Sequence, residues 1–170
     1  MGKKIICILL LLVICALLSL MGVSAYENRY FAVLLDGGYE VEESFAENNK
    51  VGYGQYDENG VIRYYDKEGI ERPKEIVRVI NSEKDAKCVF SRFSEKIDYK
   101  NEMLIIYVFM SISPRQCKVR KTKKENNVVY VELRYQRKYY FVYDTTSPQQ
   151  MIFVIKMKKT EAKEFRIKLD

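Results

Sequence analysis

The sequence predicts an α+β fold in which one helix packs on a largely antiparallel β-sheet, next to an N-terminal region of β-hairpins. Three observations support this prediction. Residues 103–110 form a continuous apolar run, which is typical of a central strand that is covered on both faces. Residues 128–135 alternate between polar and apolar, and the short connections around them favour antiparallel pairing. A single stripe of apolar residues at helical spacing lies within residues 82–97.

The first 25 residues have the organisation of a secretory signal peptide. A short basic start precedes an apolar run over residues 5–20, and Val23 and Ala25 supply the small residues of a cleavage site. We expect cleavage after Ala25, which would leave Tyr26 as the first residue of a secreted or cell-envelope protein. The alternative is an uncleaved membrane anchor, because about 18 apolar residues nearly span a bilayer.

The charge changes sign along the rest of the chain. Residues 26–75 contain 12 acidic and 6 basic residues, whereas residues 76–170 contain 11 acidic and 21 basic residues. We therefore expect an acidic β-meander region over residues 26–73 and a basic α+β domain over residues 74–170.

The acidic region begins with a predicted hairpin and continues with a repeated turn. Residues 30–35 and 39–45 are expected to pair across an Asp-Gly-Gly turn. Tyr56-Asp57-x-x-Gly60 then returns nine residues later as Tyr65-Asp66-x-x-Gly69. An Asp at the first position and a Gly at the last indicate turns, and the spacing does not fit a calcium loop. We expect three short strands around these two turns.

The basic region is expected to begin with a strand and a helix. Residues 75–80 are rich in β-branched residues, which favour a strand. Ser82, followed by Asp85, resembles a capping box at the start of a helix. The helix would pack its apolar stripe on the sheet, with the residues Ala86, Phe90, Phe93 and Ile97. The expected later strands cover residues 103–110, 116–124, 128–135, 138–143, 151–157 and 164–169.

Three stretches of the basic region carry a resemblance to a known family. VINSEKDAKCVF, NEMLIIYVFM and SPQQMIFVIKM, within residues 76–169, resemble the C-terminal domain of PrcB-like proteins, a family of exported bacterial proteins named after a component of a protease complex. The resemblance implies a non-catalytic exported module that associates with other proteins. Those proteins tend to have a Gly-Gly-Tyr-type turn after the apolar strand, whereas this chain has Ser113-Pro114-Arg115-Gln116-Cys117 there.

The composition argues against most enzyme chemistries. The chain has no histidine, which excludes Ser-His-Asp and Cys-His pairs and removes the commonest transition-metal ligand. Two cysteines outside the signal peptide cannot form a usual zinc site without histidine. The chain also lacks a Ser-x-x-Lys pair and a Gly-rich phosphate loop. We therefore expect no enzyme, no metal and no small-molecule cofactor.

Basic and aromatic residues mark a candidate binding patch in the predicted later strands. A basic stretch over residues 115–124 fits an anionic surface, such as wall polymer, lipid headgroups or an acidic partner. The alternative is a solvated edge strand whose lysines block unwanted pairing. Tyrosines that follow this stretch fit either a binding surface or ordinary cross-strand packing. The candidate patch comprises Arg115, Lys118, Arg120, Lys121, Tyr130, Arg134 and Tyr140.

Two cysteines remain after the expected cleavage. Cys88 and Cys117 form either a disulfide, as in many exported proteins, or two free thiols.

The expected function is that of an exported binding or assembly module. It would dock to another exported protein or to an anionic envelope surface, and not to nucleic acid. The alternative is a small carboxylate-dependent hydrolase that acts on cell-envelope polymer. That alternative requires two carboxylates about 5–9 Å apart in a cleft.

Overall fold

The computed structural model describes residues 32–112, 117–136 and 147–170, and in them the fold is mostly β. The predicted α+β class, with one long helix on a sheet, is wrong. The described helices are both short, α2 (Glu43–Asn48) and α3 (Glu83–Lys87). The strands are β1 (Ala32–Leu34), β2 (Tyr39–Val41), β3 (Tyr53–Tyr56), β4 (Ile62–Tyr65), β5 (Glu75–Ile80), β6 (Phe90–Phe93), β7 (Glu102–Ser111), β8 (Cys117–Glu125), β9 (Val128–Tyr135), β10 (Gln149–Lys158) and β11 (Glu164–Leu169).

A four-stranded antiparallel sheet, in the order β1-β10-β7-β5, forms the centre of the molecule. Its strand β7 is buried along most of its length, as predicted for residues 103–110. Side chains of a strand alternate between the two faces of a sheet. Leu104 and Ile106 therefore contribute to one core, while Met103 and Ile105 contribute to another. A strand with two buried faces has no room for polar side chains, which explains its continuous apolar sequence.

A three-stranded sheet, in the order β11-β9-β8, packs on one face of the central sheet. The core between the two sheets contains Ile105 and Ile155 from the central sheet and Val131 and Leu133 from β9, all essentially inaccessible to solvent. Strands β9 and β11 are parallel, although the short connections predicted mostly antiparallel pairs. Parallel neighbours need a crossover, and here the chain makes it through β10 in the other sheet.

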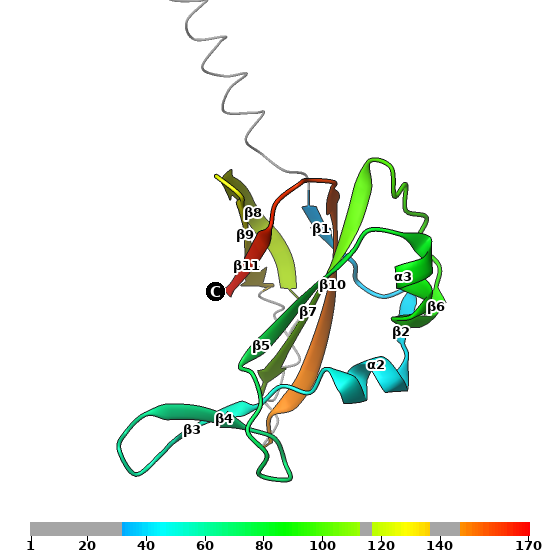
Figure 1. Cartoon of the computed structure of the whole chain (residues 1–170). Coiled ribbons are helices and arrows are strands. Elements are labelled where there is room, and N and C mark those ends of the chain that lie inside the picture. The colour runs from blue at the N-terminus through cyan, green and yellow to red at the C-terminus, as the bar shows by residue number, and fades with distance from the viewer. Residues whose placement is uncertain (1–31, 113–116, 137–146) are drawn as a thin grey trace, which may run out of the picture.

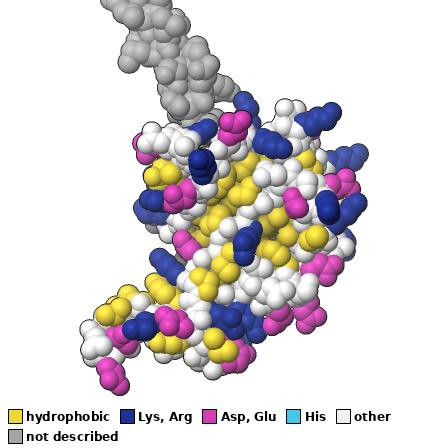
Figure 2. Space-filling view, viewed as in Figure 1, with side chains coloured by type: hydrophobic (Ala, Val, Ile, Leu, Met, Phe, Trp, Pro, Cys, Tyr) yellow, Lys and Arg dark blue, Asp and Glu magenta, His cyan; other side chains and the backbone are white. Residues whose placement is uncertain are grey.

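The helices and the β2–β6 pair cover the opposite face of the central sheet (Figure 1). Val51, Ala86 and Phe90 pack there against Leu104 and Val154. The molecule therefore has three layers around two cores. Figure 2 shows apolar side chains at the surface between β11 and α3, where β5 and β11 are the edge strands of their sheets.

The helix predicted over residues 82–97 ends after a little more than one turn. Its start is as expected: the backbone N–H of Asp85 donates to Ser82 Oγ at 3.1 Å, and Ser82 Oγ–H donates to the Asp85 carboxylate at 2.6 Å. Cys88 is the C-cap, and Phe90–Phe93 is strand β6, paired with β2. Phe90 and Phe93 satisfy a helical spacing, but aromatic residues also favour strands. The pairing with β2 decides between the two, because it supplies hydrogen bonds that no local pattern encodes.

The hairpin predicted for residues 30–35 and 39–45 is also wrong. β1 pairs with β10, β2 pairs with β6, and residues 43–48 are helix α2. The turn between β1 and β2 moves the chain from one core to the other. Leu34 packs in the core between the two sheets, whereas Tyr39 packs under the helices. Because β1 lies in the central sheet, the acidic and basic segments of the chain share one sheet.

The repeated turns build a hairpin that extends away from the three layers (Figure 1). β3 and β4 pair on either side of the first turn, with Tyr53 opposite Tyr65. The third predicted strand is reduced to a single bridge between Tyr65 and Glu71. The predicted strand over residues 138–143 lies outside the described residues.

Candidate functional site

The candidate site is the outer face of the β8–β9–β11 sheet. Strand β9 alternates as predicted: Val129, Val131 and Leu133 are buried, whereas Tyr130 and Arg134 turn outward. The neighbouring strands place cations on the same outer side. We call this surface the basic face, and it comprises Lys118, Arg120, Lys121, Lys123, Tyr130, Arg134, Arg166 and Lys168.

A β-bulge in β8 keeps the lysines of that strand on the basic face. Lys118 lies opposite Arg134, but Lys121 rather than Arg120 lies opposite Glu132. One extra residue is thus accommodated in β8, and the alternation of side chains resumes one position later. As a result, Lys121 and Lys123 are exposed on the same side as Lys118, while Thr122 is buried.

Strand β11 completes the basic face from the other side of β9. Its register places Arg166 beside Tyr130 and Lys168 beside Glu132. The Arg166 guanidinium carbon lies 5.9 Å from the centre of the Tyr130 ring, which is within the range of a cation–π contact. A shallow cavity of about 420 Å³ lies on the basic face where β8, β9 and β11 run side by side. It is lined mainly by Lys121, Lys123, Tyr130, Glu132, Arg166 and Lys168.

Only some cations of the basic face have an acidic neighbour. Arg120 contacts Glu132 at 2.6 Å, and Lys168 contacts Asp170 at 2.8 Å. The hydrogen bond from Lys168 is the main reason why the pKa of Asp170 is lowered. Two further pairs join Lys123 to Glu125 and Arg166 to Glu164. Within the described part of the chain, no ion pair involves Lys118, Lys121 or Arg134.

The structure brings together the described residues of the predicted patch. Lys118, Arg120, Lys121, Tyr130 and Arg134 all lie on the basic face. Arg115 and Tyr140 lie outside the described residues. The contribution of β11 was not predicted. Its alternation, Glu164-Phe165-Arg166-Ile167-Lys168-Leu169, does indicate a strand with polar residues on one side. No local pattern tells which strand it joins.

No disulfide joins Cys88 and Cys117, so both are thiols, which is one of the two alternatives left open by the sequence. Cys88 is exposed at the end of α3, and its Sγ lies 3.5 Å from the Lys84 carbonyl oxygen. Cys117 points into the core between the two sheets. Burial raises the pKa of the Cys117 thiol to about 11, so it is a poor nucleophile at neutral pH.

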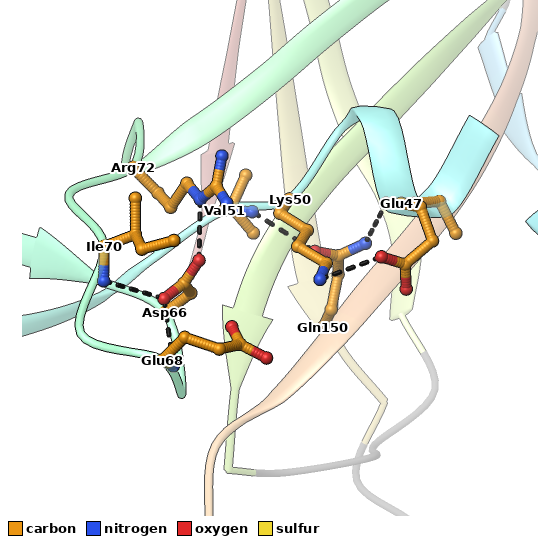
Figure 3. Close-up of polar contacts among 9 residues, drawn as sticks. Glu47, Lys50, Val51, Asp66, Glu68, Ile70, Arg72 and Gln150 are labelled. Atoms are coloured by element: carbon orange, nitrogen blue, oxygen red, sulfur yellow. Dashed lines mark hydrogen bonds and ion pairs between the residues drawn. The ribbon is translucent and has the colours of Figure 1, made fainter. Parts of the chain in front are cut away.

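A second cavity, of about 310 Å³, lies where the second Asp-x-x-Gly turn, residues 66–69, meets α2 and the start of β10 (Figure 3). We call this turn the inner turn, and the turn over residues 57–60 the outer turn. Its lining includes the carboxylates Glu47, Asp66 and Glu68. Asp66 accepts hydrogen bonds from the backbone N–H groups of Glu68 at 3.0 Å and Ile70 at 2.9 Å, and from Arg72 Nε at 2.7 Å. Burial raises the pKa of Asp66, but these hydrogen bonds outweigh it, and the net pKa is lowered.

This second cavity does not favour the hydrolase alternative. A general acid needs a raised pKa, whereas Asp66 is held as a carboxylate whose two oxygens already accept three hydrogen bonds. Glu47 is paired with Lys50 at 2.8 Å. The Gln150 side chain accepts from the Val51 N–H at 3.2 Å and donates to the Ala46 carbonyl at 3.3 Å. The polar groups of the cavity therefore mainly join the hairpin, α2 and β10.

The chain matches no protein-family model, no curated protein and no solved structure. The resemblance to PrcB-like proteins therefore stays a prediction. Within the described ranges, no helix is long and apolar enough to cross a membrane.

Proposed function

We propose that the protein is an exported, non-catalytic binding or assembly module that docks through the basic face to an acidic surface of a partner. The observation that supports this most is the gathering of seven cations and Tyr130 on one solvent-facing side of a sheet. The proposed export rests on the signal-like pattern of residues 1–25.

The arrangement of charges on the basic face supports a partner better than it supports simple solvation. Lys118 and Arg134 lie directly opposite each other on neighbouring strands. Like charges in that position destabilise a sheet, and a carboxylate from a partner would relieve the repulsion. The alternative is that the lysines only block unwanted pairing at a sheet edge, and this would explain the lysines of β8, because β8 is an edge strand. It would not account for Arg134, which lies on the central strand β9.

The basic face also offers shape and an aromatic group. Tyr130 lies in the middle of the sheet, between Lys123 and Arg166, at the shallow cavity. Aromatic residues and arginine are enriched at the centres of protein interfaces. Long basic side chains offer apolar stems as well as charge, so the same surface can bind both carboxylates and apolar groups.

The test is capture of partners from an envelope fraction, with the mature chain from Tyr26 as bait. A variant with Lys118→Glu, Lys121→Glu and Arg134→Glu reverses the three cations of the basic face that form no ion pair within the described part of the chain. We expect retention of acidic partners at low salt to fall by about tenfold or more, because close charge pairs dominate such contacts.

The matched control reverses three exposed lysines that lie away from the basic face, Lys84, Lys96 and Lys100. This control should capture the same partners as the wild type. Recovery of those partners at wild-type yield by the triple variant, Lys118→Glu with Lys121→Glu and Arg134→Glu, would contradict the proposed function.

A further inference from the structure

The hairpin leaves apolar side chains exposed at an unusual density. Its residues 53–72, which we call the arm, contain four of the six large apolar side chains that are exposed in the described structure. They are Tyr56, Val61, Ile62 and Ile70, with 77%, 54%, 47% and 50% of their surface accessible. Apolar groups gathered at the surface of a small protein commonly mark an interaction site.

Part of this apolar surface is organised on one side of the arm. Tyr56 lies opposite Ile62, and Gly54 lies opposite Tyr64, so all four share one face of the hairpin. A Cβ atom at Gly54 would lie 3.1 Å from Ile62 Cγ2 and 3.3 Å from the Tyr64 ring. Both side chains therefore lie against the bare Gly54 backbone, and together with Tyr56 they make a continuous aromatic and aliphatic surface.

The arm also carries a net negative charge. It contains five acidic residues and three basic ones. Two of the three basic residues are used within the arm: Arg63 contacts Asp57 at 3.0 Å, and Arg72 contacts Asp66 at 2.7 Å. Glu58, at the tip, is exposed and has no ion pair in the part of the chain that the structure describes.

We propose that the basic face of one copy binds the arm of a second copy, an inference that rests on the proposed function and names its partner. The two surfaces are complementary in charge and in chemistry. The rings of Tyr56 and Tyr64 are suited to the guanidinium and ammonium groups of the basic face. Ile62 packs on the aliphatic stems of the lysines, and Glu58 pairs with Lys118 or Lys121.

The arm cannot serve its own basic face, because it extends away from the β8–β9–β11 sheet (Figure 1). A two-fold dimer solves this geometry, since each copy then provides one arm and receives another. Two such contacts double the buried surface, which helps a narrow hairpin to reach the roughly 1,000 Å² that a specific interface needs.

The test is a complementation experiment on the mature chain, followed by sedimentation and light scattering. The arm variant is Tyr56→Ser with Ile62→Ser, and the basic-face variant is Lys118→Glu with Lys121→Glu. All four side chains are exposed, so both variants should fold. We expect the wild type to be a dimer and each variant alone to be a monomer. An equimolar mixture of the two variants should dimerise again, more weakly than the wild type, because the mixed dimer restores one of the two contacts between an intact arm and an intact basic face.

Val33→Ser is the matched control, because it removes an exposed apolar side chain outside the arm. It should dimerise like the wild type. A monomeric wild type at high concentration would overturn the inference. A mixture that sediments like the two separate variants at the highest concentration would also overturn it, because no intact arm would then bind an intact basic face.

The outcome is separable from that of the proposed function. The arm variant keeps its basic face but cannot use its arm, so it is a suitable bait for the envelope fraction. If the arm variant captures acidic partners and the wild type is found to be a monomer, the proposed dimer is wrong and the proposed function stands. If the basic-face variant dimerises like the wild type and also captures the same envelope partners, both are wrong.

Discussion

The two Asp-x-x-Gly turns of the arm have the same local structure in two different environments. In the outer turn, Asp57 accepts from the backbone N–H groups of Asn59 and Val61, both at 2.9 Å. Its other oxygen accepts from Arg63 Nε at 3.0 Å. In the inner turn, Asp66 repeats each of these contacts with Glu68, Ile70 and Arg72. The glycines that close the turns, Gly60 and Gly69, have φ angles of 75° and 76°.

The environments of the two turns differ. The Asp57 side chain is 18% exposed and its arginine 48%, whereas Asp66 is 7% exposed and its arginine 32%. The outer turn is at the tip of the arm. The inner turn lies beside Lys50 and Gln150, against the packed sheets and helices, which we call the body (Figure 3). Local sequence therefore sets the geometry of each turn, whereas the place of the turn in the fold sets how much of the protein's stability depends on it.

The largest expected effect comes from removal of the buried carboxylate. Asp66→Ala leaves Arg72 and two backbone N–H groups without their acceptor at the junction of arm and body. Asp57→Ala makes the same change in a more exposed place, where water replaces the lost contacts. We expect the loss of melting temperature for Asp66→Ala to be about twice that for Asp57→Ala or more, as measured by calorimetry. Equal losses would show that the arm unfolds as one unit with the body.

An intermediate and equal effect is expected at the two glycines. An L-residue in this left-handed region costs about 1–2 kcal/mol, and nothing lies within 4 Å of a Cβ built at either glycine. Gly60→Ala and Gly69→Ala should therefore destabilise their turns alike, as measured by local hydrogen exchange. A much larger effect at Gly69 would mean that the body also restrains the backbone of the inner turn.

The smallest expected effect is on the acid dependence of stability. The backbone hydrogen bond from Val61 and the contact with Arg63 lower the pKa of Asp57, and the net pKa of Asp66 is lowered as well. A carboxyl group with a lowered folded pKa stabilises the protein at pH values above its unfolded pKa, near 4, and this contribution is lost as the pH falls through the folded pKa. Asp57→Asn and Asp66→Asn should each flatten the loss of stability on acidification below about pH 4.

Denaturant unfolding at a series of pH values measures this slope. Asn59→Gln, which adds no titrating group to the outer turn, is the control. An unchanged slope in both Asp→Asn variants would show that neither carboxylate is ionised more readily in the folded protein than in the unfolded one.

Part of the candidate site was predictable because it depends on short-range patterns. The alternation over residues 128–135 correctly separated Tyr130 and Arg134 from the buried valines. The doubled Asp-x-x-Gly motif correctly predicted two turns. The same repeat also contained an overlooked signal, because an arginine follows each aspartate six residues later, Arg63 and Arg72. These arginines close the turns, so the repeat unit is longer than its turn residues alone.

Other parts depended on contacts that no local pattern encodes. Phe90 and Phe93 fit a helical stripe and a strand equally well, and the pairing with β2 selected the strand. Arg166 and Lys168 joined the basic face only because β11 lies beside β9. The bulge at Arg120 changed which residues of β8 share a face. Each of these outcomes needs a second segment that is distant in the sequence.

A few neighbouring residues specify each of the turns, the cap at Ser82, the two buried faces of β7 and the inner and outer sides of β9, so these features follow from the sequence alone. The order of the strands, the end of α3, the burial of Asp66 and the assembly of the basic face from three strands depend instead on tertiary contacts. Hydrogen bonds between strands join backbone groups, which are alike in every residue except proline. Which strands pair is therefore decided by the packing of both cores together.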